Sequence, residues 1–239
     1  IFGPAMRDTM TMVDRIALFT TFDAAAIAAL FILWSVIGWR IEHPSTRHPS
    51  TSTLMAGYRR IWMREFVTRQ PRIFDAQILS TLRQGTTFLA STCMIALGGT
   101  LALIGNADRV AGVAQDFTNT GPPAIVWEIK LMVPALLLTN AFLKFVWSNR
   151  LFGYCSVLMA AVPNDITHEK AYHRAEQAAE INITAARSFN RGLRSIYFAL
   201  AACAWLVGAS ALALATLVTC VVIWRREFAS HSRKILMDN

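Results

Sequence analysis

Three polar residues recur at regular intervals inside an otherwise apolar stretch. Asn140, Lys144 and Ser148 are spaced at i, i+4 and i+8, so a helix places them in a stripe along one face. A fourth polar residue, Asp23, interrupts another apolar stretch near the N-terminus. Ionisable residues inside a membrane are costly and are candidates for transport or proton transfer. These four residues therefore make an oligomeric transporter or channel one possible function, although Lys144 could instead extend its ammonium group to the far interface.

The elements that must position these residues are long apolar segments. Of the 239 residues, 54% are hydrophobic and only 16% are charged, whereas soluble domains carry about 25% charged residues. A helix crosses the hydrocarbon with roughly 20 apolar residues. The sequence predicts a single all-α domain over 1–239, an integral membrane bundle of four transmembrane helices with amphipathic and polar helices on the cytoplasmic side. The predicted spans are 16–39, 84–107, 126–148 extending to 162, and 195–224.

The segment 72–105 changes character along its length. Asp75, Gln77 and Arg83 lie in its polar first part, and no charged residue occurs from Gln84 to Ala107. We expect one helix that begins in water and continues as a span, with Arg83 at the bilayer face. Within this span Gly98 and Ala102 form a pair of small residues four apart, a spacing that suits close helix contact.

The basic residues predict how the chain is oriented. The net charge is +8, and its basic residues border the spans, which favours anionic lipid rather than nucleic acid as the partner. The loops 40–83 and 163–194 contain eight and five basic residues, so the positive-inside rule places both in the cytoplasm. Both termini then lie outside, most simply across a bacterial inner membrane. The basic C-terminal tail argues against this topology through Arg225, Arg226, Arg233 and Lys234.

The 40–83 loop contains an amphipathic segment. Apolar residues recur at helical spacing over 53–69, with arginines on the other side, and such a helix either lies on anionic lipid or packs on the protein's own spans. At the inner side, the candidates for contact with lipid or a partner are Asp75, Gln77, Arg83, Arg150 and Arg191. At the outer interface the candidates are Glu128 and Lys130.

The sequence contains no set of residues typical of a catalytic or metal site. Its four cysteines form no Cys-x-x-Cys pair, which gives no disulfide or metal signal. His43 and His48 each precede a proline, in a connector that we interpret as a rigid elbow. We expect no catalytic residue and no metal ligand, and no cofactor is implied.

Several short motifs follow one another in a characteristic order. They are His43-Pro44 followed by Gly57 and Trp62, ILSTLRQGTTFLAST at 78–92, WEIK at 127–130, SNRLF at 148–152 and FNRG at 189–192. The chain resembles the membrane-protein family called domain of unknown function 599, found in bacteria and plants. The resemblance implies four spans and supplies no catalytic residue. It directs attention to Arg83, Lys130, Arg150 and Arg191, and Gln84 departs from the asparagine that plant members tend to have.

These observations leave three hypotheses about function. The first is an accessory, scaffold or assembly subunit of a larger membrane complex, because packing residues are present and catalytic motifs are not. The second is the oligomeric transporter or channel described above. The third is a membrane enzyme acting on lipid or quinone at the inner interface, where His43, His48, His173 and the arginines would bind head groups. Under the first two hypotheses the chain acts as a homo-oligomer or as one subunit of a larger assembly.

Overall fold

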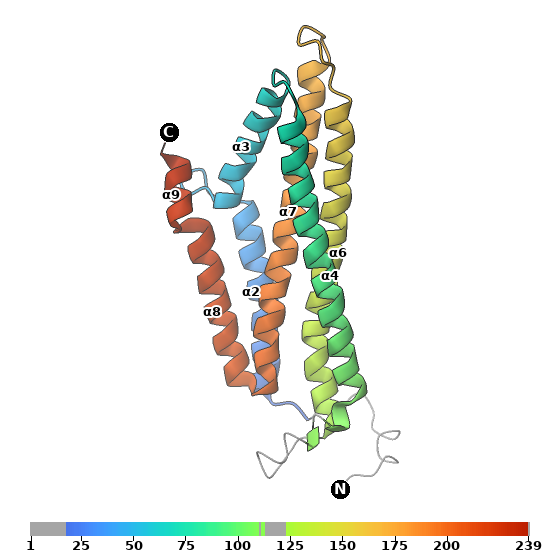
Figure 1. Cartoon of the computed structure of the whole chain (residues 1–239). Coiled ribbons are helices and arrows are strands. Elements are labelled where there is room, and N and C mark those ends of the chain that lie inside the picture. The colour runs from blue at the N-terminus through green and yellow to red at the C-terminus, as the bar shows by residue number, and fades with distance from the viewer. Residues whose placement is uncertain (1–17, 110, 113–122, 239) are drawn as a thin grey trace.

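A computed structural model describes residues 18–238 apart from 110 and 113–122, and this part of the chain contains helices and no strand (Figure 1). The all-α membrane bundle is therefore confirmed. The elements are α2 (Thr21–Glu42), α3 (Thr51–Phe66), α4 (Ile73–Gly105), α6 (Ala124–Ala160), α7 (Ala171–Cys203), the short 3-10 helix η2 (Ala204–Leu206), α8 (Ala209–Phe228) and α9 (His231–Met237). Four segments are long and apolar enough to cross a membrane, namely α2, α4, α6 and the stretch of α8 and α9.

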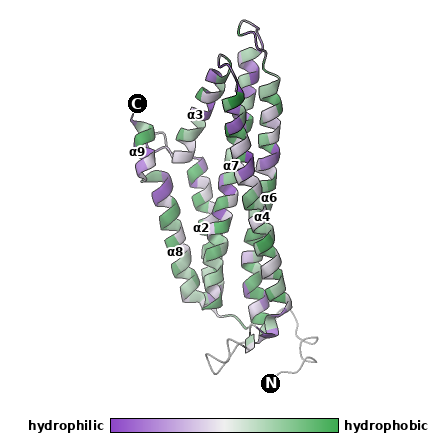
Figure 2. Ribbon diagram, in the orientation of Figure 1, coloured by the Kyte–Doolittle hydropathy of each residue, from purple (hydrophilic) through white to green (hydrophobic). Residues whose placement is uncertain are grey.

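Two of these helices extend well past the others. The helix α4 is continuous from Ile73 to Gly105, as predicted for the segment that begins in water and continues as a span. The helix α6 is continuous from Ala124 to Ala160. Both extend beyond α2 and α8 at the end of the molecule where α3 lies (Figure 1). Figure 2 shows more hydrophilic residues in α3 and in the upper parts of α4 and α7. This end of the bundle therefore suits water, and the lower part suits lipid.

The first span begins later than predicted. Residues 16 and 17 lie outside the described part, and α2 starts at Thr21 because Thr20 and Asp23 form a capping box. The Asp23 backbone N–H donates to Thr20 Oγ1 over 3.1 Å, and the Thr20 N–H donates to Asp23 Oδ2 over 3.1 Å. This reciprocal pair satisfies two N–H groups at the helix start. Asp23 therefore lies in the first turn of α2.

The predicted fourth span over 195–224 is wrong as a single helix. The chain leaves α7 at Cys203, forms η2, and starts α8 at Ala209, which runs back beside α7 (Figure 1). Gly208 makes the reversal with a φ of 158°, a conformation that glycine reaches more easily than other residues. The absence of charge over 195–224 could not reveal this reversal, because both arms of the turn are apolar.

The helix α7 occupies the centre of the bundle. It packs along α6 and also contacts α2, α3 and α8. Its buried face is rich in alanine over 171–202, which lets neighbouring helices approach closely. Because protein rather than lipid covers α7, this helix needs little of the hydropathy that marks a lipid-facing span.

The C-terminal segment returns to the end of the bundle that carries α3. Arg233 Nε donates to the Pro49 carbonyl over 2.8 Å, and Ser52 Oγ donates to Glu227 Oε1 over 2.9 Å. We call this end, with α3, the 43–50 connector and α9, the basic end. The start of α2 lies at the opposite end (Figure 1). The prediction that both termini lie outside assumed one span over 195–224, whereas α2 starts and α9 ends at opposite ends of the bundle.

Candidate functional site

The predicted stripe on α6 faces α7. Ser148 Oγ donates to the Ala185 carbonyl over 2.8 Å, and Ser188 Oγ donates to the Lys144 carbonyl over 3.0 Å. Further along, Ser195 Oγ donates to Asn140 Oδ1 over 3.4 Å. These three contacts, which we call the α6–α7 ladder, connect the two helices over successive turns. Hydrogen bonds of this kind hold membrane helices together, so the spacing that suggested a transport path belongs to helix packing.

A close approach between the same helices accompanies the ladder. A Cβ added to Gly192 would lie 2.9 Å from the ring of Phe145, which is fully buried. Only a residue without a side chain fits at this point of α7. The Lys144 side chain is half-buried, and its backbone carbonyl, not its ammonium group, takes part in the ladder.

The outer-end candidates form a local cluster around the start of α2. Besides its capping role, Asp23 accepts a hydrogen bond from Trp205 Nε1 over 2.7 Å. Lys130 Nζ lies 5.6 Å from the ring centroid of Trp127 and 5.8 Å from that of Trp205. Glu128 is half-buried beside them on α6. Asp23 thus ties the start of α2 to the turn after α7, a structural role.

At the basic end, Asp75 is buried and connects α3 to α4. It accepts from Trp62 Nε1 over 2.6 Å and forms an ion pair with Arg69. Gln77 is exposed on the same helix. Asp75 was predicted as a contact for lipid or a partner, but its side chain is enclosed by this contact. Gln77 remains accessible.

The two arginines predicted for the inner side differ in their surroundings. Arg150 is exposed and donates to the hydroxyl of Tyr154 over 2.5 Å on its own helix. Arg191 reaches from α7 to Glu42 at the end of α2, with Nε 2.8 Å from Oε1 and a second contact from Nη2 to Oε2. Glu42 also accepts from Arg194 over 2.6 Å. Arg191 therefore takes part in a network that joins α2 to α7.

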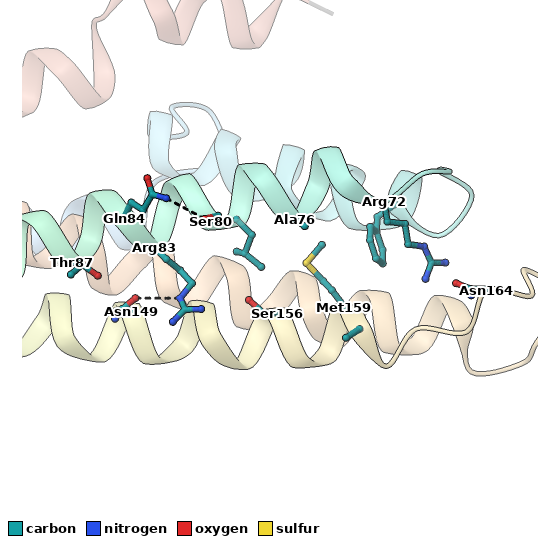
Figure 3. Close-up of a pocket in the computed structure, with 13 residues that line it drawn as sticks. Arg72, Ala76, Ser80, Arg83, Gln84, Thr87, Asn149, Ser156, Met159 and Asn164 are labelled. Atoms are coloured by element: carbon teal, nitrogen blue, oxygen red, sulfur yellow. Dashed lines mark hydrogen bonds between the residues drawn. The ribbon is translucent and has the colours of Figure 1, made fainter.

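The remaining candidate, Arg83, lines an open groove between α4 and α6 (Figure 3). Arg83 Nε lies 3.5 Å from Asn149 Oδ1 across the groove, and Arg72 and Asn164 lie toward its other end. The groove has a volume of about 810 Å³. Among the described residues that line it, the large apolar ones are Phe66, Leu79 and Met159, and the charged ones are Arg72 and Arg83.

The same face of α4 continues from the groove into the membrane. The groove is lined by Ala76, Ser80, Arg83, Gln84 and Thr87. Successive steps of three, four or seven residues lead from these to the exposed residues Ser91, Gly98, Ala102 and Gly105, and such steps keep to one side of a helix. A Cβ added at Gly98 or Gly105 would meet nothing within 4 Å. We call the whole surface the α4 face.

The comparison with protein families matches nearly the whole chain. The model of the family described as "Protein of unknown function, DUF599" matches residues 25–232. The chain belongs to the DUF599 family. No curated protein and no solved structure matches it.

In this DUF599 protein, sequence reasoning found the groove only in part. Arg83 was a candidate, but the groove also depends on Asn149, Ser156 and Met159 of α6, and nothing in the sequence pairs these with α4. The pair Gly98 and Ala102 was the one sequence signal for the membrane part of the α4 face. Within the described ranges no group of three or more His, Cys, Asp or Glu residues is placed to hold a metal ion.

Proposed function

We propose that this DUF599 protein is an accessory or scaffold subunit of a larger membrane complex, and that it binds a long helix of a partner membrane protein along the α4 face. The observation that carries the proposal is the continuity of this face. It combines an open groove of about 810 Å³ at the basic end with a row of exposed small residues in the membrane. One helix that crosses the bilayer and continues into water would fit both parts.

The position of α4 within the bundle supports a missing neighbour. Among the described elements α4 packs extensively only against α6, whereas α7 contacts helices on several sides. Small residues offer little apolar area to lipid but let a second helix approach closely and pack well. No described element of the chain packs closely on Gly98 or Gly105, where an added Cβ would meet nothing within 4 Å.

The charge and shape of the groove favour a different protein over a second copy. A two-fold pair brings the same patch of both copies together, so two hollows would face each other and Arg72 and Arg83 would approach their own counterparts. Neither arginine shares the groove lining with a carboxylate. We therefore expect the partner helix to carry an acidic residue at the level of Arg83. The positive-inside rule places the basic end, and with it the groove, in the cytoplasm of a bacterial cell.

The test is site-specific photo-crosslinking in native membranes. A photoreactive residue is placed at Ser80 in the groove or at Gly98 in the membrane part. The matched controls are Leu214 and Val218, which are 65% and 53% exposed on α8. We expect Ser80 and Gly98 to give an adduct of one and the same mass, with the crosslinked peptide in a helix of another membrane protein, and we expect no such adduct from the controls. An adduct of two 26.5 kDa chains, or lipid adducts alone, would overturn the proposal.

The transporter alternative keeps the Lys144 ammonium group, but the side chains of Asp23, Asn140 and Ser148, on which it also depended, have partners within the chain. Asp23 takes part in the cap of α2 and in the bond from Trp205, and the polar stripe takes part in the α6–α7 ladder. The enzyme alternative relied on histidines in the loops, and His43 bonds through Nδ1 to the Trp39 carbonyl over 3.1 Å and stacks on the Trp39 ring. Neither alternative gains an observation of its own.

A further inference from the structure

A second cavity lies at the basic end, away from the α4 face. It has a volume of about 450 Å³ and lies between the end of α2, the 43–50 connector, α3 and α7. Among the described residues, Glu42 is its one lining carboxylate. The described arginines that line it are Arg59, Arg60, Arg187 and Arg194. We call this cavity the arginine pocket.

The carboxylates near the pocket compensate only part of this positive charge. Glu42 lies between Arg191 and Arg194, and Glu180 pairs with Arg60 over 2.7 Å. No carboxylate in the described part of the chain lies within ion-pair distance of Arg59 or Arg187. Two positive charges of the lining therefore have no carboxylate partner among the described residues.

Arg59 is the more informative of these two residues. It is half-buried, and its guanidinium donates to the neutral side chain of Asn182. Burial lowers the pKa of the Arg59 guanidinium, as expected for a cation that is taken out of water without a counter-ion. A half-buried guanidinium of this kind attracts an anion that enters the cavity from outside the protein.

The start of α3, which borders the pocket, does not offer free donors from Ser52 to such an anion. The backbone N–H and the hydroxyl of Ser52, in the first turn of α3, already donate to Glu227. The lining also includes the hydroxyls of Ser45 and Thr46, and that of Thr53, which bonds to Ser50 Oγ over 2.9 Å. Guanidinium groups with nearby hydroxyls suit a tetrahedral oxyanion, because the planar fork of arginine donates two parallel hydrogen bonds to it.

The position of the pocket relative to the bilayer indicates where that anion comes from. Glu42 is the last residue of α2, the first membrane-spanning helix, so the pocket lies where the bilayer meets water. We propose that the arginine pocket binds a phosphate group, held by Arg59 and Arg187, at the depth of the lipid headgroups. The phosphate comes from an acidic phospholipid or from a soluble phosphorylated molecule. This proposal does not depend on the α4 face or on its partner.

The test measures ligand binding to the full chain in detergent. Native mass spectrometry and titration with phosphatidylglycerol compare the wild type with Arg59→Gln, Arg187→Gln and the double variant. Arg64→Gln is the matched control, because Arg64 is an exposed arginine on α3 that does not line the pocket. Arg59→Lys keeps the charge at the same position. Thermal unfolding of each variant checks that the fold is retained.

We expect each pocket variant to weaken phosphatidylglycerol binding about tenfold, since a charge-assisted hydrogen bond has about that effect on affinity. Arg64→Gln should bind as the wild type does, and Arg59→Lys should retain most of the binding. Inorganic phosphate identifies the source: displacement of the lipid by millimolar phosphate indicates a soluble ligand, and retention of the lipid indicates a headgroup site. Equal losses in Arg64→Gln and the pocket variants, or no loss in any variant, would overturn the proposal.

Discussion

The contact between α6 and α7 and the α4 face contain the same kinds of residue and use them differently. Between α6 and α7, serines donate across the contact, and a Cβ on Gly192 would lie 2.9 Å from Phe145. On the α4 face, a Cβ on Gly98 would meet nothing within 4 Å, and Arg83 has only a 3.5 Å contact with Asn149. Small and polar residues at helical spacing thus show that a helix contact exists. Only the structure shows whether the contact is made within the chain or left for a partner.

The largest expected effect is the difference in unfolding free energy between substitutions at Gly192 and at Gly98. Gly192→Ala should lower the free energy of unfolding by about 2 to 3 kcal/mol, because the new methyl group overlaps the Phe145 ring in a packed contact. Gly98→Ala should leave it unchanged or raise it by up to about 1 kcal/mol through helix propensity. Denaturant unfolding in one detergent measures both variants side by side. Equal costs at the two positions would show that both glycines are packed within the chain.

Two arginines of the basic end differ in a similar way: Arg194 pairs with Glu42, whereas Arg187 has no carboxylate partner in the described part of the chain. Arg194→Gln should cost about 2 kcal/mol, because Glu42 loses one of two partners in a largely buried network. Arg187→Gln should change stability by less than about 0.5 kcal/mol, as for an exposed side chain without such contacts. Thermal unfolding at one ionic strength compares the two. A large cost for Arg187→Gln would mean that its charge stabilises the fold itself.

A smaller cost than those of Gly192→Ala and Arg194→Gln is expected in the α6–α7 ladder. Ser148→Ala and Ser188→Ala should each cost about 0.6 kcal/mol, the average for a hydrogen bond between membrane helices. Lys144→Met should leave the ladder intact, because the backbone carbonyl of Lys144 is the acceptor. Unfolding curves measure the stabilities, and a reconstituted flux assay supplies the independent comparison. Ion or solute flux that depends on Lys144 would restore the transporter hypothesis.

The sequence predicted the membrane class and the polar-to-apolar course of α4 because both follow from the distribution of charge along the chain. The course over 195–224 could not be predicted, since hydropathy does not distinguish one long span from a helix that turns back at Gly208. The role of Asn140, Lys144 and Ser148 was also hidden. A polar stripe looks the same whether it faces a pathway or the serines of a neighbouring helix, and the position of α7 depends on packing rather than on its hydropathy.

The most direct test of the account is the native mass and composition of the protein extracted gently from its own membrane, as wild type and as Gly98→Phe. We predict that the wild type carries a second membrane protein in near-stoichiometric amount. Gly98→Phe should lose this partner while its unfolding curve matches that of the wild type, because the added ring meets no atom of the chain near Cβ. A wild-type protein that runs alone, or as a homo-oligomer that Gly98→Phe leaves intact, would contradict the account.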